Sequence, residues 1–194
     1  DPADGQAYTY SQFEVPDARR VYTTFEQPDL KSTFTLTVKV PKGWKVFSNA
    51  PTPSPEEDGD AWTYRFATTE TMSTYITAIV AGPYQGTTAS LTSSDGRTID
   101  LGVYARASIV EHLDAEEIID ITRRGFEFFE SAYGIAYPFT KYDQIFVPEY
   151  NAGAMENAGC VTFRDAYVFR TRPTEAQMEA RANTILHELA HMWF

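Results

Sequence analysis

Alternating apolar and polar residues dominate the first hundred positions of the chain. Residues 33–40 alternate strictly, the period of two that predicts a half-buried strand, and residues 62–66 repeat the pattern. The more continuous apolar run at 75–80 suits a buried strand, and Asp95-Gly96 separates two strand-like segments as a hairpin turn does. Residues 51–60, rich in proline and acidic side chains, predict a surface loop. This part is therefore expected to form an antiparallel sheet or sandwich.

A helical period replaces this alternation after Tyr104. Asp114-x-x-Glu117 has the spacing of a capping box, and apolar residues then recur every three or four positions. Gly134 is placed to end the helix, because glycine adopts the left-handed conformation of a C-cap at low cost. The pattern predicts one helix of about five turns.

Two strands and a second helix are expected in the remaining residues. Residues 144–147 and 160–163 have strand patterns, and a glycine-rich turn over 151–159 separates them. Thr174-x-x-Gln177 predicts the capped start of a helix that continues to Phe194. The sequence thus indicates the α+β class, with residues 1–101 in an antiparallel β-rich domain and residues 102–194 in a mixed one.

Composition and charge narrow the range of functions. The chain has 16 Lys and Arg against 27 Asp and Glu, a net charge of −11 that repels nucleic acid and anionic lipid, so neither is an expected partner. Cys160 is the only cysteine, which leaves histidine and carboxylate as the ligands for any metal. No apolar run approaches the roughly 20 residues that span a bilayer, and no signal-peptide pattern or cysteine pair is visible. These features favour a cytoplasmic location, and they leave the oligomeric state open.

The most informative motif is His187-Glu188-Leu189-Ala190-His191, an HExxH pattern on the second predicted helix. Residues four apart lie on the same face of a helix, so both imidazoles can bind a single metal ion. Zinc in catalytic sites takes three protein ligands and leaves one position for water. Glu188, turned about 100° from His187 around the helix, is placed to accept a proton from that water.

A purely structural interpretation competes with the metal site. A single histidine on an apolar face is usually a packed core residue, but here two of the three histidines flank a glutamate at ligand spacing. Met178, Ile185 and Leu189 belong to an apolar stripe roughly opposite the pair, so one side of the helix packs while the other faces a site. The spacing favours a metal site, whereas His112 is expected at the surface.

A second motif, Gly153-Ala154-Met155-Glu156-Asn157, lies upstream of the HExxH. Alone it would be a tight turn with a surface glutamate. Together with the HExxH it resembles the exopeptidase signature, GAMEN, of the aminopeptidase N family of zinc metallopeptidases. The similarity extends over essentially the whole chain and includes Ser11–Arg20, Phe25–Pro28 and Lys31–Phe34.

The resemblance implies a saddle-like, antiparallel β-rich N-terminal domain followed by the first part of a thermolysin-like catalytic domain. It also implies that the chain begins inside the first domain and ends inside the second. One zinc ion is expected per complete site. The third zinc ligand, a glutamate, and the tyrosine that stabilises the oxyanion are expected beyond Phe194.

The resemblance further assigns roles to individual residues. His187 and His191 should bind zinc, Glu188 should activate the water, and Glu156 should bind the α-amino group of the substrate with Glu14 as a second carboxylate. From the residues alone, Glu14 would be a surface glutamate on a β edge. The substrate-binding set that the resemblance implies comprises Glu14, Gly153, Ala154, Met155, Glu156 and Asn157.

The pairing of two carboxylates with an amine also has a physical basis. An α-ammonium that enters a water-poor cleft unpaired costs several kcal/mol. Carboxylates at Glu14 and Glu156 would hold that amine and place the first peptide bond at the metal, whereas blocked peptides would leave them unpaired.

Three hypotheses follow from the sequence. The first is a zinc aminopeptidase that releases N-terminal residues from peptides with a free N-terminus. A thermolysin-like endopeptidase would share His187, Glu188 and His191 but would not need Glu156. The third is a catalytically incomplete piece that binds zinc weakly through two histidines and has no activity of its own.

Overall fold

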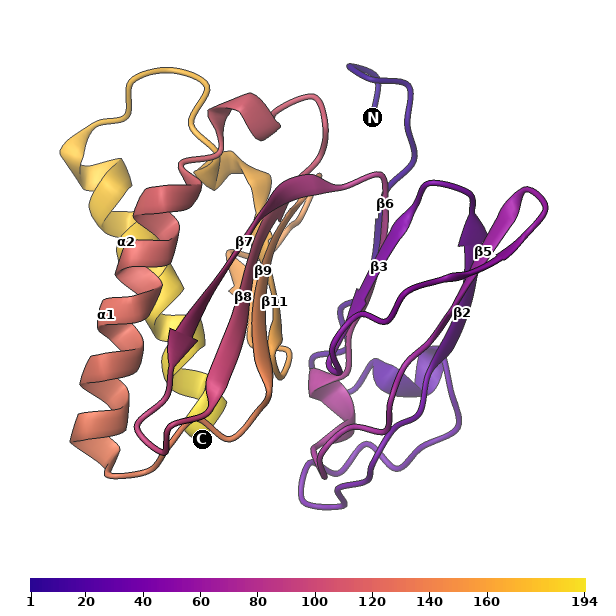
Figure 1. Cartoon of the computed structure of the whole chain (residues 1–194), viewed down its shortest axis with the longest axis horizontal. Coiled ribbons are helices and arrows are strands. Elements are labelled where there is room, and N and C mark those ends of the chain that lie inside the picture. Colours follow the sequence, from indigo (N-terminus) through magenta and orange to yellow (C-terminus); the bar gives the residue numbers. More distant parts are fainter. The chain divides into compact units, whose positions relative to one another are not determined.

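Two three-stranded antiparallel sheets make up residues 1–84 of the computed structural model, which describes residues 1–194 (Figure 1). The strand order of the first sheet is β1 (Thr9–Tyr10), β6 (Ile79–Gly82), β3 (Lys45–Ser48). The order of the second is β2 (Thr37–Pro41), β5 (Ala61–Arg65), β4 (Glu56–Asp58). Val40, Tyr64 and Phe66 are buried in the core of this unit, as their alternation predicts.

Two local predictions for this unit were wrong in part. Residues 56–58 were expected in a loop but form the edge strand β4, where opposite charges lie across the sheet: Arg65 contacts Glu56 at 3.0 Å and Lys39 contacts Asp58 at 3.2 Å. The run at 75–80 was expected to be one strand, but it begins as the 3-10 turn η2 (Thr74–Ile76). The carbonyl of Thr74 there accepts the N–H of Thr77, so the chain turns before β6 starts.

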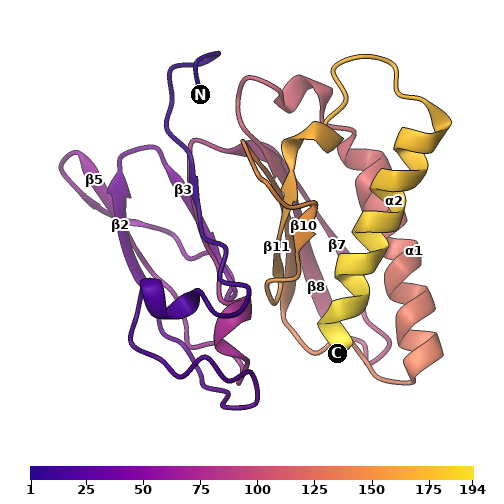
Figure 2. The same ribbon diagram turned by 180° about the vertical axis from the view of Figure 1, so that it is seen from behind.

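Residues 85–194 form the second compact unit, a five-stranded sheet with both long helices on one face (Figures 1 and 2). Its order is β10 (Ala154–Met155), β11 (Cys160–Arg164), β9 (Lys141–Val147), β8 (Thr98–Ala105), β7 (Gln85–Thr92). The central strands β8, β9 and β11 are parallel, and each edge strand is antiparallel to its neighbour. The predicted hairpin turn at Asp95-Gly96 is confirmed, with Gly96 at φ +85°.

The parallel pairing follows from a βαβ connection that the sequence pattern did not reveal. Strand β8 leads through the 3-10 turn η3 (Val110–His112) into helix α1 (Ala115–Tyr133), which returns the chain to β9. Gly134 ends α1 at φ +65°, as predicted. The break between the two compact units falls at residues 84 and 85, while the expected change near residue 101 lies within β8. The assignment of 1–101 and 102–194 to two domains stays a prediction.

Both helix starts were predicted as capping boxes, and one of them is wrong. Thr174 and Gln177 cap helix α2 (Glu175–Ala190) reciprocally, as expected. Asp114 precedes α1 but its side chain accepts no bond from the helix; instead Asp114 and Glu117 accept from Arg181 at 2.9 and 2.6 Å. Helix α2 also ends at Ala190, and the 3-10 turn η5 (His191–Trp193) continues the chain.

A close approach of α1 and α2 fixes the position of α2 on the sheet. A Cβ added at Gly125 of α1 would lie 2.7 Å from methyl groups of both Leu186 and Leu189 of α2, so glycine is what allows this packing. Ile185 and Leu189 of α2 are fully buried in the core of this unit. Neither helix is long and apolar enough to cross a membrane.

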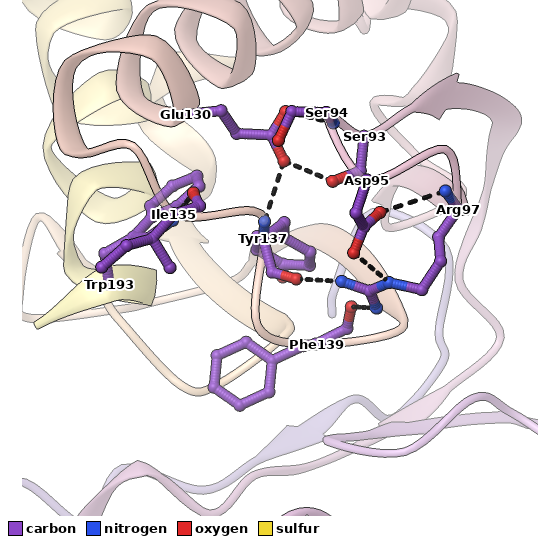
Figure 3. Close-up of polar contacts among 9 residues, drawn as sticks. All are labelled: Ser93, Ser94, Asp95, Arg97, Glu130, Ile135, Tyr137, Phe139 and Trp193. Atoms are coloured by element: carbon purple, nitrogen blue, oxygen red, sulfur yellow. Dashed lines mark hydrogen bonds and ion pairs between the residues drawn. The ribbon is translucent and has the colours of Figure 1, made fainter.

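A buried carboxylate joins the C-terminal end of α1 to two loops of the sheet (Figure 3). Glu130 accepts hydrogen bonds from the hydroxyl of Ser93, from the N–H of Ser94 at 2.8 Å and from the N–H of Tyr137 at 2.8 Å. Arg97 donates to the carbonyls of Tyr137 and Phe139, which fastens the hairpin turn to the α1–β9 loop. These contacts set where β9 begins.

Candidate metal centre and active site

Two imidazoles converge at the C-terminal end of α2. The Nε2 atoms of His187 and His191 lie 3.2 Å apart, and the two rings are inclined at 80° with centroids 4.8 Å apart. His187 is exposed and His191 is half-buried. The i, i+4 spacing brings the rings together because residues four apart lie one above the other on a helix.

The distance between these nitrogen atoms fits a shared metal ion. Two imidazole nitrogens bound tetrahedrally to one zinc, at about 2.05 Å each, would lie about 3.3 Å apart. The 3.2 Å separation of the His187 and His191 Nε2 atoms is close to this distance. No third histidine, cysteine, aspartate or glutamate joins them in a cluster of three, so the chain brings two ligands together.

Glu188 lies between the histidines in sequence but on the buried side of α2. It is 5% exposed, next to the fully buried Leu189. Tyr142 of β9 faces the helices, where its ring contacts Phe126 of α1. Burial raises the pKa of Tyr142 well above its ordinary value, and the negative charge of Glu188 raises it further. The carboxylate of Glu188 therefore lies close to a sheet tyrosine that sequence reasoning missed, since only the tertiary fold brings the two residues together.

The signature turn, residues 153–157, runs along the edge of the five-stranded sheet beside α2 (Figure 2). Ala154 pairs with Phe163 and Met155 with Thr162, and the carbonyl of Gly153 accepts the N–H of Arg164 at 3.0 Å. These backbone bonds to β11 hold the turn against the sheet. The interior strand β11 is itself fixed by β9, so the turn has a rigid support.

The side chains of the signature turn differ in exposure. Glu156 is half-buried, whereas Met155 and Asn157 are 1% and 0% exposed. The amide of Asn157 donates to the hydroxyl of Thr162 on β11 at 3.4 Å. In this chain Met155 and Asn157 therefore shape the turn through their side chains, and a substrate contact from either would come from the backbone.

The structure thus brings most of the predicted site residues into one unit. Contacts between α2 and β10 make the histidine helix and the signature turn neighbours. Glu14 belongs to the other unit, where its N–H donates to the side chain of Gln12 and its carboxylate accepts from Gln12 Nε2 at 3.4 Å. Its participation with Glu156 stays a prediction.

The remaining candidate ligands lie outside this group. His112 is paired with Glu111 at 3.8 Å on η3, with its side chain 36% exposed. Cys160 is fully buried in β11, and burial raises the pKa of its thiol to about 12. A thiol with this pKa remains protonated at neutral pH and is inert as a ligand or nucleophile.

The convergent imidazoles, the adjacent glutamate and the α+β fold are typical of metallopeptidases with an HExxH helix. Residues 117–194 match the peptidase family M1 domain, and residues 3–76 match the peptidase M1 N-terminal domain. The chain belongs to peptidase family M1. Over its whole length it is 58% identical to a Streptomyces lividans protein named aminopeptidase N.

More distant relatives carry the same name. Over 95% of the chain, an aminopeptidase N of Lactobacillus helveticus is 36% identical and one of Bos taurus is 35% identical. The chain spans 22% of the Streptomyces lividans relative and 21% and 19% of the other two. It therefore corresponds to about a fifth of each of these proteins, across the N-terminal and catalytic domains of the family.

Proposed function

We propose that the protein containing this chain is a zinc-dependent aminopeptidase that releases N-terminal amino acids from peptides. The single observation that carries the proposal is the convergence of two imidazole nitrogens to 3.2 Å on a helix that contacts the signature turn. Membership of family M1 and the names of the relatives support the same activity.

His187 and His191 are the residues that would hold zinc, with one further protein ligand needed for a catalytic set. Zinc bound there would polarise the scissile carbonyl and lower the pKa of water. Glu188 would take the proton from the attacking water and deliver it to the leaving amine. Its burial supports this role, because a site closed to bulk water limits leakage of the transferred proton to solvent.

Glu156 would bind the α-ammonium group of the substrate, with Glu14 as its partner carboxylate. The half-buried position of Glu156 suits this task, because an ion pair gains strength as water is excluded. The backbone of Gly153 and Ala154, at the outer edge of the sheet, would pair with the substrate main chain. One amine site at a fixed distance from the metal limits cleavage to the first peptide bond.

The activity is tested on a full-length protein that contains these residues, with free and N-acetylated forms of one peptide. Free peptides should be cleaved and acetylated ones resisted, and Glu156→Gln should raise KM for the free peptide. Glu188→Gln should lower kcat by about 10²- to 10⁴-fold, the usual contribution of a general base. Equal cleavage of free and acetylated peptides would support an endopeptidase and overturn the proposal.

The isolated chain of 194 residues should bind zinc weakly and show no peptidase activity, because two histidines form an incomplete ligand set. Titration with zinc or cobalt(II) measures this affinity. His187→Ala and His191→Ala should each abolish the binding, whereas His112→Ala should leave it unchanged. Binding that survives both α2 substitutions would contradict the assignment of the ligands.

A further inference from the structure

Tyr167 connects the sheet that carries the signature turn to the helix that carries the histidines. It is the last residue of the 3-10 turn η4 (Asp165–Tyr167), which follows β11 directly, and its hydroxyl lies 3.1 Å from Oγ1 of Thr184 on α2. The same hydroxyl lies 4.0 Å from the position that a Cβ on Gly153 would take. Tyr167 is therefore bound to the helix and lies near the beginning of the signature turn.

The direction of this hydrogen bond follows from the proton count on Thr184. Its hydroxyl has one proton, which it donates to the carbonyl of Ala180 at 2.9 Å. Thr184 must then accept from Tyr167. The carbonyl of Tyr167 also accepts from Nη1 of Arg181 at 3.2 Å, and Arg181 is 1% exposed. Tyr167 is thus bound to α2 through both its side chain and its backbone.

A second contact joins the residues just after the signature turn to η5, which directly follows α2. The N–H of Gly159 donates to Sδ of Met192 at 3.4 Å, and Met192 is 5% exposed. Met192 directly follows His191, and Thr184 precedes His187 by less than one helical turn. The sheet that carries the signature turn is therefore tied to the histidine segment at two points, by Tyr167 to Thr184 and by Gly159 to Met192.

We propose that Tyr167 and Thr184, assisted by Met192, are positioning residues that set the span between Glu156 and the histidine pair. Strand β10 is two residues long and its backbone bonds fix it to β11, so its separation from α2 depends on how the end of β11 is held against that helix. Tyr167 supplies this tie, because it lies in η4 directly after β11 and its hydroxyl is bonded to Thr184 of α2. This inference rests on the proposed function, because the span matters only if an amine binds at Glu156 while zinc holds the reacting group.

The consequence is selectivity for ligands that engage both points. A ligand with an α-amine and a metal-binding group gains affinity only when both partners lie at the right separation. Loss of the Tyr167–Thr184 bond removes one neutral hydrogen bond, so the advantage conferred by the amine should fall about five-fold. A ligand without the amine should bind as before, since it does not contact Glu156 and its affinity does not depend on the distance between Glu156 and the histidines.

The test compares two hydroxamates by calorimetry on the zinc-loaded, full-length protein. Alanine hydroxamate carries the amine, and propionohydroxamate is the matched ligand that lacks it. The Kd ratio is the Kd of propionohydroxamate divided by the Kd of alanine hydroxamate. This ratio should fall about five-fold in Tyr167→Phe and in Thr184→Val. Thr184→Ser keeps the acceptor and should retain the wild-type ratio, and Met192→Leu should lower it to a smaller extent. Tyr167→Phe keeps the ring, so a single cooperative thermal transition shows that the variant still folds.

A Glu156→Gln variant separates failure of the inference from failure of the proposed function. If the wild-type ratio is near one, or Glu156→Gln leaves it unchanged, the proposed function is overturned. If Glu156→Gln collapses the ratio but Tyr167→Phe and Thr184→Val do not lower it, the positioning role is overturned. Equal weakening of both hydroxamates also overturns that role, since general damage to the site would affect the two ligands alike. In the Glu156→Gln background, Tyr167→Phe should have no further effect on the ratio.

Discussion

Replacing Glu130 with alanine should destabilise the second unit by about 3 kcal/mol, because it removes the acceptor for three donors at once (Figure 3). Glu130 is 8% exposed at the end of α1, and its partners come from the β7–β8 hairpin and the α1–β9 loop. The contact therefore joins the end of α1 and the loop that follows it to a hairpin 36 residues earlier in the chain.

The magnitude depends on which donors water can reach after the change. Tyr137 is 0% exposed, so its orphaned N–H should cost about 2 kcal/mol, whereas the exposed Ser94 N–H can be hydrated and should cost no more than about 1 kcal/mol. The Ser93 hydroxyl can rotate toward another acceptor. Glu130→Gln keeps one carbonyl oxygen for the Ser93 and Tyr137 donors, so it should cost only about 1 kcal/mol.

Urea denaturation of the 194-residue chain, followed by circular dichroism, measures these losses. The slope of the free energy of unfolding against urea concentration should not change. Glu127→Ala is the matched control, because Glu127 is exposed on the same helix and should change stability by less than about 0.5 kcal/mol. The reasoning would be refuted by a loss below about 1 kcal/mol for Glu130→Ala, or by equal losses in both alanine variants.

Three further predictions concern residues around the site. Burial raises the pKa of Cys160 from 9.0 to about 12, so the unfolded chain releases this proton first. The free energy of unfolding should therefore fall by about 2 kcal/mol between about pH 8 and about pH 10.5. Denaturation at several pH values measures this fall, and the Cys160→Ala variant should lack it. Arg181→Met should lower the free energy of unfolding, measured in urea, by about 2 kcal/mol, because it breaks two ion pairs of a buried guanidinium. The loss is no larger because the half-exposed carboxylate partners can be hydrated. Arg124→Met, at an exposed ion pair, should be nearly neutral. Gly125→Ala should lower stability by about 1–2 kcal/mol despite the better helix propensity of alanine, because its Cβ would lie 2.7 Å from Leu189; an unchanged thermal midpoint would contradict that packing.

The two capping boxes show why some features could be predicted and others could not. Thr174 and Gln177 are close in sequence and bind each other reciprocally, so the local pattern decides their contact. Asp114 and Glu117 have the same spacing, but Arg181 binds both carboxylates from 67 and 64 positions away. A charged partner buried by the packing of two helices outweighs a local cap, and no pattern near Asp114 reveals it.

Strand order has the same dependence on distant residues. The alternating pattern located β5 and the β7–β8 hairpin because side-chain period and turn residues are local properties. The parallel neighbours β8 and β9 depend on the crossover through α1, and η2 depends on where the chain must turn before β6. These choices are made by the packing of whole elements, which a window of residues does not contain.

The sequence by itself determined which two imidazoles converge, because residues four apart on a helix lie one above the other wherever that helix lies. It also determined the signature motif and the ends of the helices marked by Gly134 and Thr174. Only the tertiary structure decided that Glu188 is buried with its charge acting on Tyr142, and that Tyr167 joins the end of β11 to α2. Contacts of this kind form when elements far apart in the chain pack on one sheet, so their chemistry is absent from any local pattern.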